Sequence, residues 1–332
     1  MRKLVYVVAT AAAVAAGTSV LLAAQGGAAP TPPLWAYPVN APPPPGTPPP
    51  TPPPVDDSPK RVPNSDVSMT LKQIRDFSKV PDWHPSDHPP MPPVIAAARP
   101  PDVRFGCGYC HYPNGKGRPE NAGVAGLPAA YIIQQMADYR AGNRKSSEPR
   151  MGPPSLMLAL AKAVTEEEIK TAAAYFASLK WTQWIKVIEA RDVPKTRIAG
   201  GMFVPIEGGG TEPLGSRILE MPEHLERTEI RDSQSPFLAY VPVGSIKKGE
   251  ALARGGNGKT VQCSICHGSD LKGMGPVPGL AGRSPSYTFR QLFDLKHGSR
   301  NGLWADLMKP VVAKLTDEDM LNLAAFTASR VP

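Results

Sequence analysis

The sequence predicts an all-α protein in which an irregular connector with short strands joins two tandem helical domains, behind a proline-rich N-terminal extension. Three observations predict this architecture. A five-residue motif with two cysteines and a histidine occurs twice, similar helical patterns follow both copies, and 14 of the 25 residues from 30 to 54 are proline. The 332 residues suffice for about two domains of ordinary size.

Residues 1–29 have the pattern of an export segment. Arg2 and Lys3 precede the uncharged stretch from Leu4 to Ala24, and small residues follow it. As a helix this stretch would be about 31 Å long, enough to cross a bilayer, whereas a cleaved signal usually has an apolar core of about 7–15 residues. We favour a cleaved signal peptide because small residues crowd its end. An uncleaved anchor through residues 4–24 stays open. Either fate predicts a periplasmic protein, free or held at the inner membrane.

Residues 30–64 are predicted to be a linker. Proline lacks a backbone N–H and fixes φ, so this stretch is expected to extend as polyproline II or to form a disordered tail rather than to pack.

The first domain is predicted to span residues 65–180. Ser68 or Thr70 is expected to cap a short helix that carries Leu71, Ile74 and Phe77 on one side. The irregular stretch that follows contains potential metal ligands, but histidines beside prolines in loops are common and better candidates exist. These residues are His84, His88 and Met91.

A repeat of 156 residues relates the first domain to a second, predicted over residues 244–332. The shift superposes the two cysteine–histidine motifs and several residues after them. The matched pairs are Lys116 and Lys272, Gly117 and Gly273, Tyr131 and Tyr287, Gln135 and Gln291, Asp138 and Asp294, Gly142 and Gly298, and Arg144 and Arg300.

Each copy is predicted to contain two longer helices after its motif. Residues 131–141 and 287–297 form the first pair, and a glycine follows each of them, as at many helix ends. Thr165 and Thr316 begin capping-box patterns for the final helices. The connector, residues 181–243, lacks helical periodicity but has too many aromatic and branched residues for a floppy linker, so we expect an ordered segment with a small hairpin.

The two motifs, Cys107–His111 and Cys263–His267, have the Cys-x-x-Cys-His spacing of c-type haem attachment. Two thiols on one helical turn reach the two vinyl groups of a porphyrin, and the next imidazole reaches the iron. We therefore predict two covalently attached haems, with thioether bonds at Cys107, Cys110, Cys263 and Cys266 and iron ligation by His111 and His267. The chain has four cysteines, so none remains for a disulfide, a zinc site or a nucleophile.

The sixth iron ligands are predicted to be methionines, whose soft sulfur favours ferrous iron. Met308 precedes the cap Thr316 by eight residues, and Met157 precedes the cap Thr165 by the same number. Met151 competes in the first copy, because it lies 40 residues after His111 while Met308 lies 41 after His267. We favour Met157 over Met151, since the ligand segment packs with the final helix. His297 is an alternative ligand, but its place at a helix end is better explained by the helix dipole.

These residues resemble class I c-type cytochromes, and the duplication resembles the dihaem cytochrome c4 type. The resemblance covers roughly residues 94–180 and 244–330. It implies two cytochrome c-like helical domains and a protein that passes electrons from a quinol-oxidising complex or a dehydrogenase to an oxidase. The proline-rich extension, Pro100-Pro101 before the first motif and the long connector depart from the family pattern.

We therefore predict an electron carrier in a respiratory chain, not an enzyme, because two six-coordinate irons leave no vacant site. Two alternatives remain. A dihaem cytochrome c peroxidase would need one open iron, and a fixed cytochrome subunit of a membrane complex would account for the extension and the connector. The formal net charge of +8 does not indicate nucleic-acid binding, because haem propionates would offset much of it.

Overall fold

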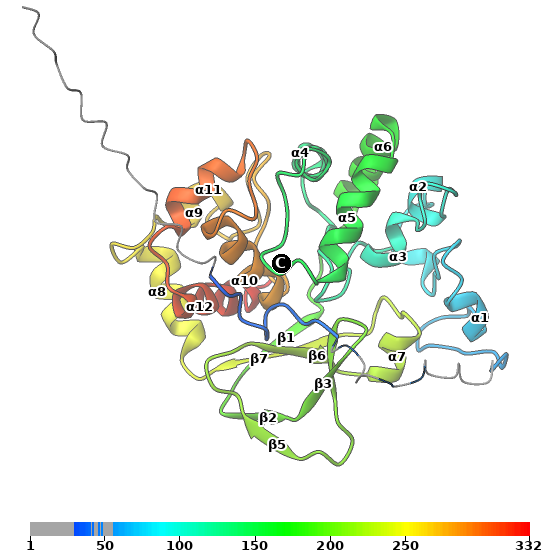
Figure 1. The fold of residues 1–332 in the computed structure, drawn as a ribbon, viewed down its shortest axis with the longest axis horizontal. Helices are drawn as coiled ribbons and strands as arrows, with labels where there is room; N and C mark the ends of the chain where they lie inside the picture. Colours follow the sequence, from blue (N-terminus) through cyan, green and yellow to red (C-terminus); the bar gives the residue numbers. More distant parts are fainter. Residues whose placement is uncertain (1–29, 41, 43–45, 47, 49–55) are drawn as a thin grey trace, which may run out of the picture. The chain divides into compact units, whose positions relative to one another are not determined.

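The computed structural model describes residues 30–40, 42, 46, 48 and 56–332, so the predicted export segment lies outside the described residues. The described residues from 31 onward form one compact unit (Figure 1). Among the described residues, no helix is both long and apolar enough to cross a membrane.

The first domain contains six α-helices, which Figure 1 shows in blue to green. Thr70 caps the first of them and Thr165 caps the last, each through a complete capping box. Gly142, with a φ of +71°, follows the end of the central helix as predicted. The helices are α1 (Leu71–Ile74), α2 (Pro93–Ala96), α3 (Cys107–His111), α4 (Ala129–Arg140), α5 (Gly152–Ala163) and α6 (Glu166–Ser178), and a 3-10 turn covers Pro85–Asp87.

The second domain contains α8 (Ser245–Gly255), α9 (Ser264–His267), α10 (Pro285–Lys296), α11 (Ala305–Val312) and α12 (Asp317–Ala328), of which the last four correspond to α3–α6. Its core lies between α8, α10 and α12, and nearly all of α12 is buried. Helices α8 and α12 cross closely at Gly249, where an added Cβ would lie 1.9 Å from the carbonyl oxygen of Asn322. Any side chain at this position would push the two helices apart.

The connector holds more β-structure than the sequence predicted, so the all-α expectation is only partly confirmed. In its three-stranded sheet β7 lies between β1, to which it is parallel, and β6, to which it is antiparallel. Two short antiparallel pairs, β3–β4 and β2–β5, accompany the sheet. The elements are β1 (Ile185–Ala190), β2 (Asp192–Pro194), β3 (Thr196–Ala199), β4 (Met202–Pro205), β5 (Thr211–Pro213), β6 (Leu219–Pro222), α7 (Leu225–Glu229) and β7 (Phe237–Pro242).

Long-range pairing explains this difference. Strand β7 alternates buried and half-buried residues, with Phe237, Ala239 and Val241 inside, as a strand of period two should. Its parallel partner β1 lies about 50 residues earlier in the chain, with Ile185 opposite Phe237. Composition predicts a β-prone segment, but it does not identify which distant segment will pair with it.

The proline-rich linker also differs from expectation at one place. Ala36 and Tyr37 are fully buried in the core of the second domain. The Tyr37 hydroxyl donates to Asp294 Oδ1 at 2.7 Å, and the Trp35 ring lies 4.5 Å from that of Phe289. Residues 35–37 are therefore a packed anchor rather than part of an extended spacer, because two aromatic side chains bury enough apolar surface to offset their ordering.

We predict that Tyr37→Ala lowers the free energy of unfolding by about 3–5 kcal/mol, because it removes a buried aromatic ring and leaves Asp294 without this donor. Leu34→Ala is the matched control, since Leu34 is 59% exposed in the same segment, and it should cost less than about 0.5 kcal/mol. Urea unfolding of the haem-loaded protein measures both. Equal effects of the two variants would show that the segment is not anchored.

Candidate haem centres

The two Cys-x-x-Cys-His motifs form short helices, α3 and α9, at equivalent places in the two domains. Cys107 and Cys110 are half-buried free thiols one helical turn apart, and Cys263 is also half-buried. Burial raises the pKa of Cys107 to about 12, and the pKa of Cys263 is raised for the same reason. Cys107 and Cys110 lie on one short helix with the histidine next to the second of them, the placement that two thioether bonds to a single porphyrin require.

A single hydrogen bond orients each histidine. His111 Nδ1 lies 2.8 Å from the carbonyl oxygen of Ala122, and His267 Nδ1 lies 2.8 Å from that of Pro278. A carbonyl only accepts hydrogen bonds, so each Nδ1 carries the proton and each Nε2 keeps a free lone pair. Burial lowers the pKa of both imidazoles, which keeps them neutral. This arrangement is typical of a histidine that ligates metal through Nε2.

Glycines explain how the chain returns to meet each imidazole. Gly117 N donates to His111 O at 2.8 Å, and Gly273 N donates to His267 O at 2.8 Å. Both glycines have a positive φ, +67° and +97°. An added Cβ would lie 2.7 Å from a carbonyl oxygen in either loop, that of Ala122 in the first and Val277 in the second. The repeated glycine is therefore needed for the hydrogen bond that holds the histidine.

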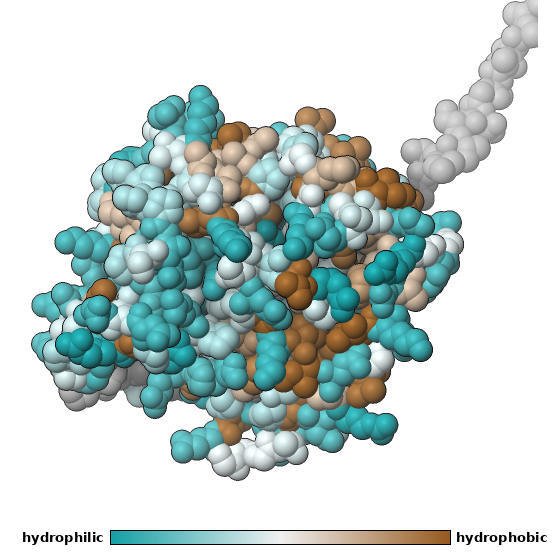
Figure 2. Space-filling model, turned by 180° about the vertical axis from the view of Figure 1, so that it is seen from behind, coloured by the Kyte–Doolittle hydropathy of each residue, from teal (hydrophilic) through white to brown (hydrophobic). Residues whose placement is uncertain are grey.

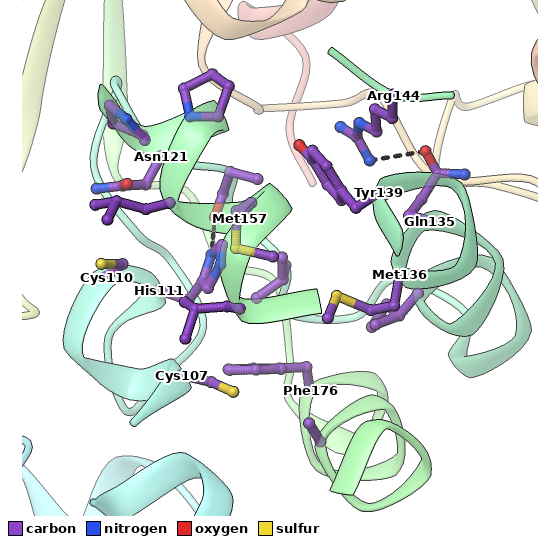
Figure 3. A pocket seen from close by; sticks show the side chains of 18 of the residues that line it. Cys107, Cys110, His111, Asn121, Gln135, Met136, Tyr139, Arg144, Met157 and Phe176 are labelled. Atoms are coloured by element: carbon purple, nitrogen blue, oxygen red, sulfur yellow. Dashed lines mark hydrogen bonds between the residues drawn. The ribbon is translucent and has the colours of Figure 1, made fainter. Parts of the chain in front are cut away.

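A large apolar cavity lies beside α3 in the first domain (Figure 3). It encloses about 1530 Å³, part of which is open to solvent. Cys107, Cys110 and His111 line one side, and Met157 on α5 lines another. The remaining apolar walls come from Val94, Val103, Phe105, Leu127, Ile132, Met136, Leu160, Val164, Ile169 and Phe176.

The structure separates the two methionine candidates of the first domain. Met157 lines the cavity and points into it in Figure 3. Met151, by contrast, is 2% exposed and packs in the core of the second domain. Met151 directly precedes α5, and Ser147 just before it contacts Asp294 and Ser299 of the second domain. The Met151 side chain therefore still lies at the domain interface.

The second domain carries the corresponding residues beside its core. Cys263 and Met308 both pack against the core of the second domain, and His267 is buried. Met308 lies on α11 as Met157 lies on α5. Cys266 differs from the other three cysteines because it is exposed.

The far end of the first cavity is polar and cationic, and this end touches the second domain. Arg144, from the loop after α4, and Arg290, on α10, both line it and are both buried. A cavity with apolar walls, two thiols, an oriented imidazole and buried guanidinium groups at one end fits a haem, whose ring is apolar and whose propionates are anionic.

Sequence analysis missed that the repeated polar residues meet each other across the domain interface. Arg144 donates to Tyr287 Oη at 2.8 Å and to Gln291 Oε1 at 3.0 Å. Arg300 makes the reciprocal contacts, to Tyr131 Oη at 2.8 Å and Gln135 Oε1 at 2.9 Å. Arg144 and Arg300 also pair through their backbones in an isolated bridge. The two copies are thus related by an approximate two-fold axis. The tyrosine, glutamine and arginine that recur in both repeats were the sequence signal for this contact.

The other candidate ligands have different partners. His84 contacts Asp232 and His88 contacts Asp82, while Met91 packs against the core of the first domain. His297 follows the end of α10, and its ring lies 4.3 Å from that of Phe293. Among the described residues, no group of three or more His, Cys, Asp or Glu side chains is placed to hold a metal ion.

No family model matches the chain. Cytochrome c-554(548) of Halomonas halodenitrificans is 37% identical over 83 residues, which cover 25% of this chain and 98% of that protein. The chain is a c-type cytochrome. Specifically, it is a dihaem cytochrome of class I that resembles cytochrome c4 and carries two covalently bound haem c groups.

Other relatives align over a larger share of this cytochrome. Cytochrome c4 of Azotobacter vinelandii is 23% identical over 66% of this chain and 82% of its own length. The thiosulfate dehydrogenase electron acceptor of Thiomonas intermedia is 26% identical over 72% of this chain and 84% of its own. The crystal structure of cytochrome c4 from Pseudomonas stutzeri superposes with a TM-score of 0.44 at 22% identity over 68% of this chain and 93% of that chain. The cytochrome acts in electron transfer with redox protein partners.

Because the interface is approximately two-fold symmetric, its two equivalent arginine–tyrosine hydrogen bonds should contribute similar free energies to stability. Double-mutant cycles for Arg144→Met with Tyr287→Phe, and for Arg300→Met with Tyr131→Phe, should give similar coupling energies of about 1–3 kcal/mol. Each cycle isolates the hydrogen bond from a guanidinium to a phenol from the other contacts of the same arginine. Urea unfolding of the haem-loaded protein measures them. A coupling energy near zero in one cycle alone would contradict the reciprocal interface.

Proposed function

We propose that this cytochrome is an electron carrier whose two irons are each held between a histidine and a methionine, His111 with Met157 and His267 with Met308. The observation that carries the proposal is the first cavity, where the imidazole of His111 and the thioether of Met157 face a common space. The matched place of Met308 on α11 extends it to the second domain.

When bound, the haem supplies an iron that takes up and releases one electron. The protein residues set how readily it does so. The carbonyls of Ala122 and Pro278 hold the imidazoles in one orientation and make them better donors. A neutral methionine sulfur favours the ferrous state and raises the potential. The apolar walls limit water and act in the same direction.

The proposed setting is a periplasmic or membrane-associated respiratory chain. The electron donor would be a quinol-oxidising complex or a dehydrogenase, and the acceptor an oxidase. A relative named as the electron acceptor of thiosulfate dehydrogenase supports a dehydrogenase as donor. Anchorage through residues 4–24 would make the protein a fixed subunit of a membrane complex. The dihaem peroxidase alternative requires an iron without a sulfur ligand.

The methionine assignments predict a pattern of potentials. Met157→Ala and Met308→Ala should each lower the potential of one haem and remove one sulfur–iron charge-transfer band, because water or another hard ligand replaces sulfur. Met151→Ala is the matched control. It should leave both potentials unchanged while costing about 2–5 kcal/mol of unfolding free energy, because Met151 fills the core of the second domain.

A redox titration followed by optical spectra measures all three variants. A lowered potential in Met151→Ala together with an unchanged one in Met157→Ala would reverse the assignment for the first haem. If the sulfur–iron charge-transfer band of the wild-type protein had the intensity of only one methionine-ligated iron per chain, a peroxidase would be favoured.

A further inference from the structure

One arginine of the second domain, Arg283, binds both of the loops that hold the motif histidines. Its Nε donates to the carbonyl oxygen of Gly279 at 2.7 Å, and its Nη1 donates to that of Gly123 at 2.8 Å. Its Nη2 donates to the carbonyl oxygen of Ala125 at 3.1 Å. Gly123 and Gly279 are equivalent in the repeat of 156 residues, so one guanidinium joins matching atoms of the two domains.

The carbonyls that bind this arginine lie next to those that orient the imidazoles. In the first domain the carbonyl of Ala122 holds His111 Nδ1. The next carbonyl along the chain, that of Gly123, accepts from Arg283. The second domain has the same order of contacts, again on successive residues. A single peptide unit therefore separates the guanidinium from the hydrogen bond of each histidine.

The indole of Trp181, shortly after α6, packs on the same contact. The centre of one of its rings lies 4.4 Å from the guanidinium carbon of Arg283, and its Nε1 donates to the carbonyl oxygen of Ala281 at 3.1 Å. An added Cβ at Gly123 would lie 2.7 Å from this indole, so only glycine fits there. The two histidine loops are thus fastened to each other from both sides.

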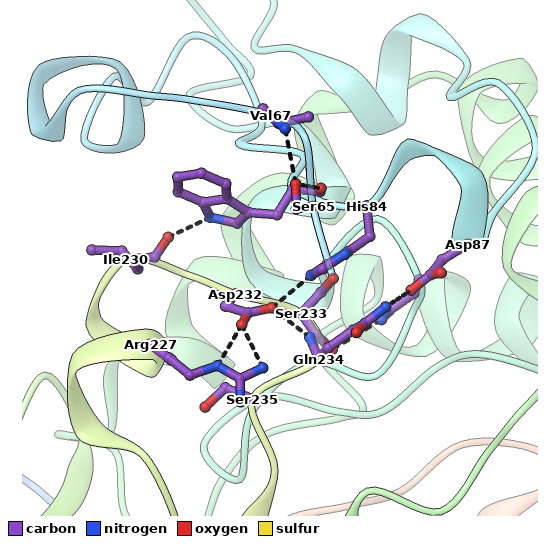
Figure 4. A network of polar contacts seen from close by, with 12 residues as sticks. Ser65, Val67, His84, Asp87, Arg227, Ile230, Asp232, Ser233, Gln234 and Ser235 are labelled. Atoms are coloured by element: carbon purple, nitrogen blue, oxygen red, sulfur yellow. Dashed lines mark hydrogen bonds and ion pairs between the residues drawn. The ribbon is translucent and has the colours of Figure 1, made fainter. Parts of the chain in front are cut away.

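The charge of Arg283 is buried, and its hydrogen-bond partners are neutral. Its three acceptors among the described residues are all backbone carbonyl oxygens. In the network of Figure 4, by contrast, Arg227 donates to the carboxylate of Asp232 at 2.7 Å. Burial lowers the pKa of Arg283 to about 10, so the guanidinium still carries its charge at neutral pH.

The groups around Arg283 leave this charge largely uncompensated. The titratable groups that act on it most are two phenols, those of Tyr131 and Tyr287. Glu220 binds the hydroxyl of the neighbouring Ser284, but burial raises the pKa of this carboxyl and so favours its neutral form. Because the protein interior screens charge less than water does, the field of Arg283 extends to both histidine loops.

We propose that Arg283 is a positioning residue shared by both haem centres, and that its buried charge raises the reduction potentials of both irons together. Reduction adds one electron to a centre, so a cation beside each histidine loop stabilises the ferrous state. The counterpart of Arg283 in the repeat is Leu127, so the second copy alone supplies this charge. The inference rests on the proposed function, since it requires two redox-active irons held by His111 and His267.

The experiment compares Arg283→Gln with Arg283→Lys in the haem-loaded protein. Glutamine keeps amide donors for the carbonyls but has no charge, whereas lysine keeps the charge without the planar fork. A redox titration followed in the haem absorption bands at about pH 6 gives the potentials of both irons, since a buried lysine is most fully charged at low pH.

Two controls separate the buried charge from other effects. Figure 2 shows many polar side chains on the surface, where water screens a charge. Arg254→Gln removes a charge of this kind, because the Arg254 side chain is 71% exposed. Met151→Ala lowers stability in the core of the second domain without removing a charge.

The expected result is that Arg283→Gln makes the reduction of each iron about tenfold less favourable, which corresponds to a fall of about 59 mV in both potentials. Arg283→Lys should stay within about twofold of the wild-type equilibrium at both irons, and the two controls should leave both potentials unchanged. Unchanged potentials in Arg283→Gln, or a fall at one iron alone, would overturn the proposal. An equal fall in Arg283→Lys at low pH would also overturn it, because charge would then not be the cause.

The lysine variant tests the proposal even if Arg283→Gln does not fold. A buried lysine loses its proton more easily than an arginine, so both potentials of Arg283→Lys should fall relative to wild type between about pH 6 and pH 9. The sign follows because deprotonation removes the positive charge that favours the ferrous state. A fall at only one iron over this range would contradict a shared residue.

The same titrations separate this inference from the proposed function. The wild-type protein should take up two electrons per chain if both haems are carriers. Uptake of only one electron would overturn the proposed function. Two electrons combined with potentials that do not respond to Arg283→Gln would overturn the role of Arg283 alone.

Discussion

Each haem centre depends on the hydrogen bond between the histidine Nδ1 and a backbone carbonyl eleven residues further on, Ala122 in one domain and Pro278 in the other. It fixes the tautomer, directs Nε2 toward the site and requires the loop to return past a glycine with positive φ. The cysteines and the histidine come from one short helix. In the proposed centres the opposite ligand, Met157 or Met308, comes from the helix that follows α4 or α10, so the packing of those helices would set the second half of each site.

The local parts of this arrangement could be predicted from the sequence. The two motifs, the capping boxes at Thr165 and Thr316 and the helix ends at Gly142 and Gly298 depend on residues within a few positions of one another. The preference for Met157 over Met151 came from its spacing to the final helix and stays a prediction, while the structure places Met157 at the wall of the first cavity. Met151 could not be placed from sequence, because its neighbours belong to the other domain.

What could not be predicted depends on contacts between distant segments. The repeat revealed Arg144 and Arg300 as equivalent residues, but not that they meet on an approximate two-fold axis. The β-prone connector gave no sign that Arg231 would lie over Tyr109. Trp35 and Tyr37 looked like part of a spacer because prolines surround them, whereas their rings pack on α10. In each case the energy comes from a partner that lies about 100 residues or more away in the chain.

Duplication provided two similar haem units, and the segments outside the repeat make them different. Residues 77–88 and 227–235 lie outside the repeated helices, and Phe77 and Arg231 from these segments pack on Tyr109 of the first motif. The internal contacts of the two centres stay alike while their surroundings diverge.

The most direct test of two saturated irons is exposure of the purified, reduced protein to carbon monoxide. Chemical analysis of the same sample counts the haems. We predict two haems per chain and no change in the visible spectrum on adding the gas, because methionine sulfur occupies the sixth position at each iron. A single haem, or rapid uptake of carbon monoxide at one centre, would contradict the account and indicate a site for catalysis instead.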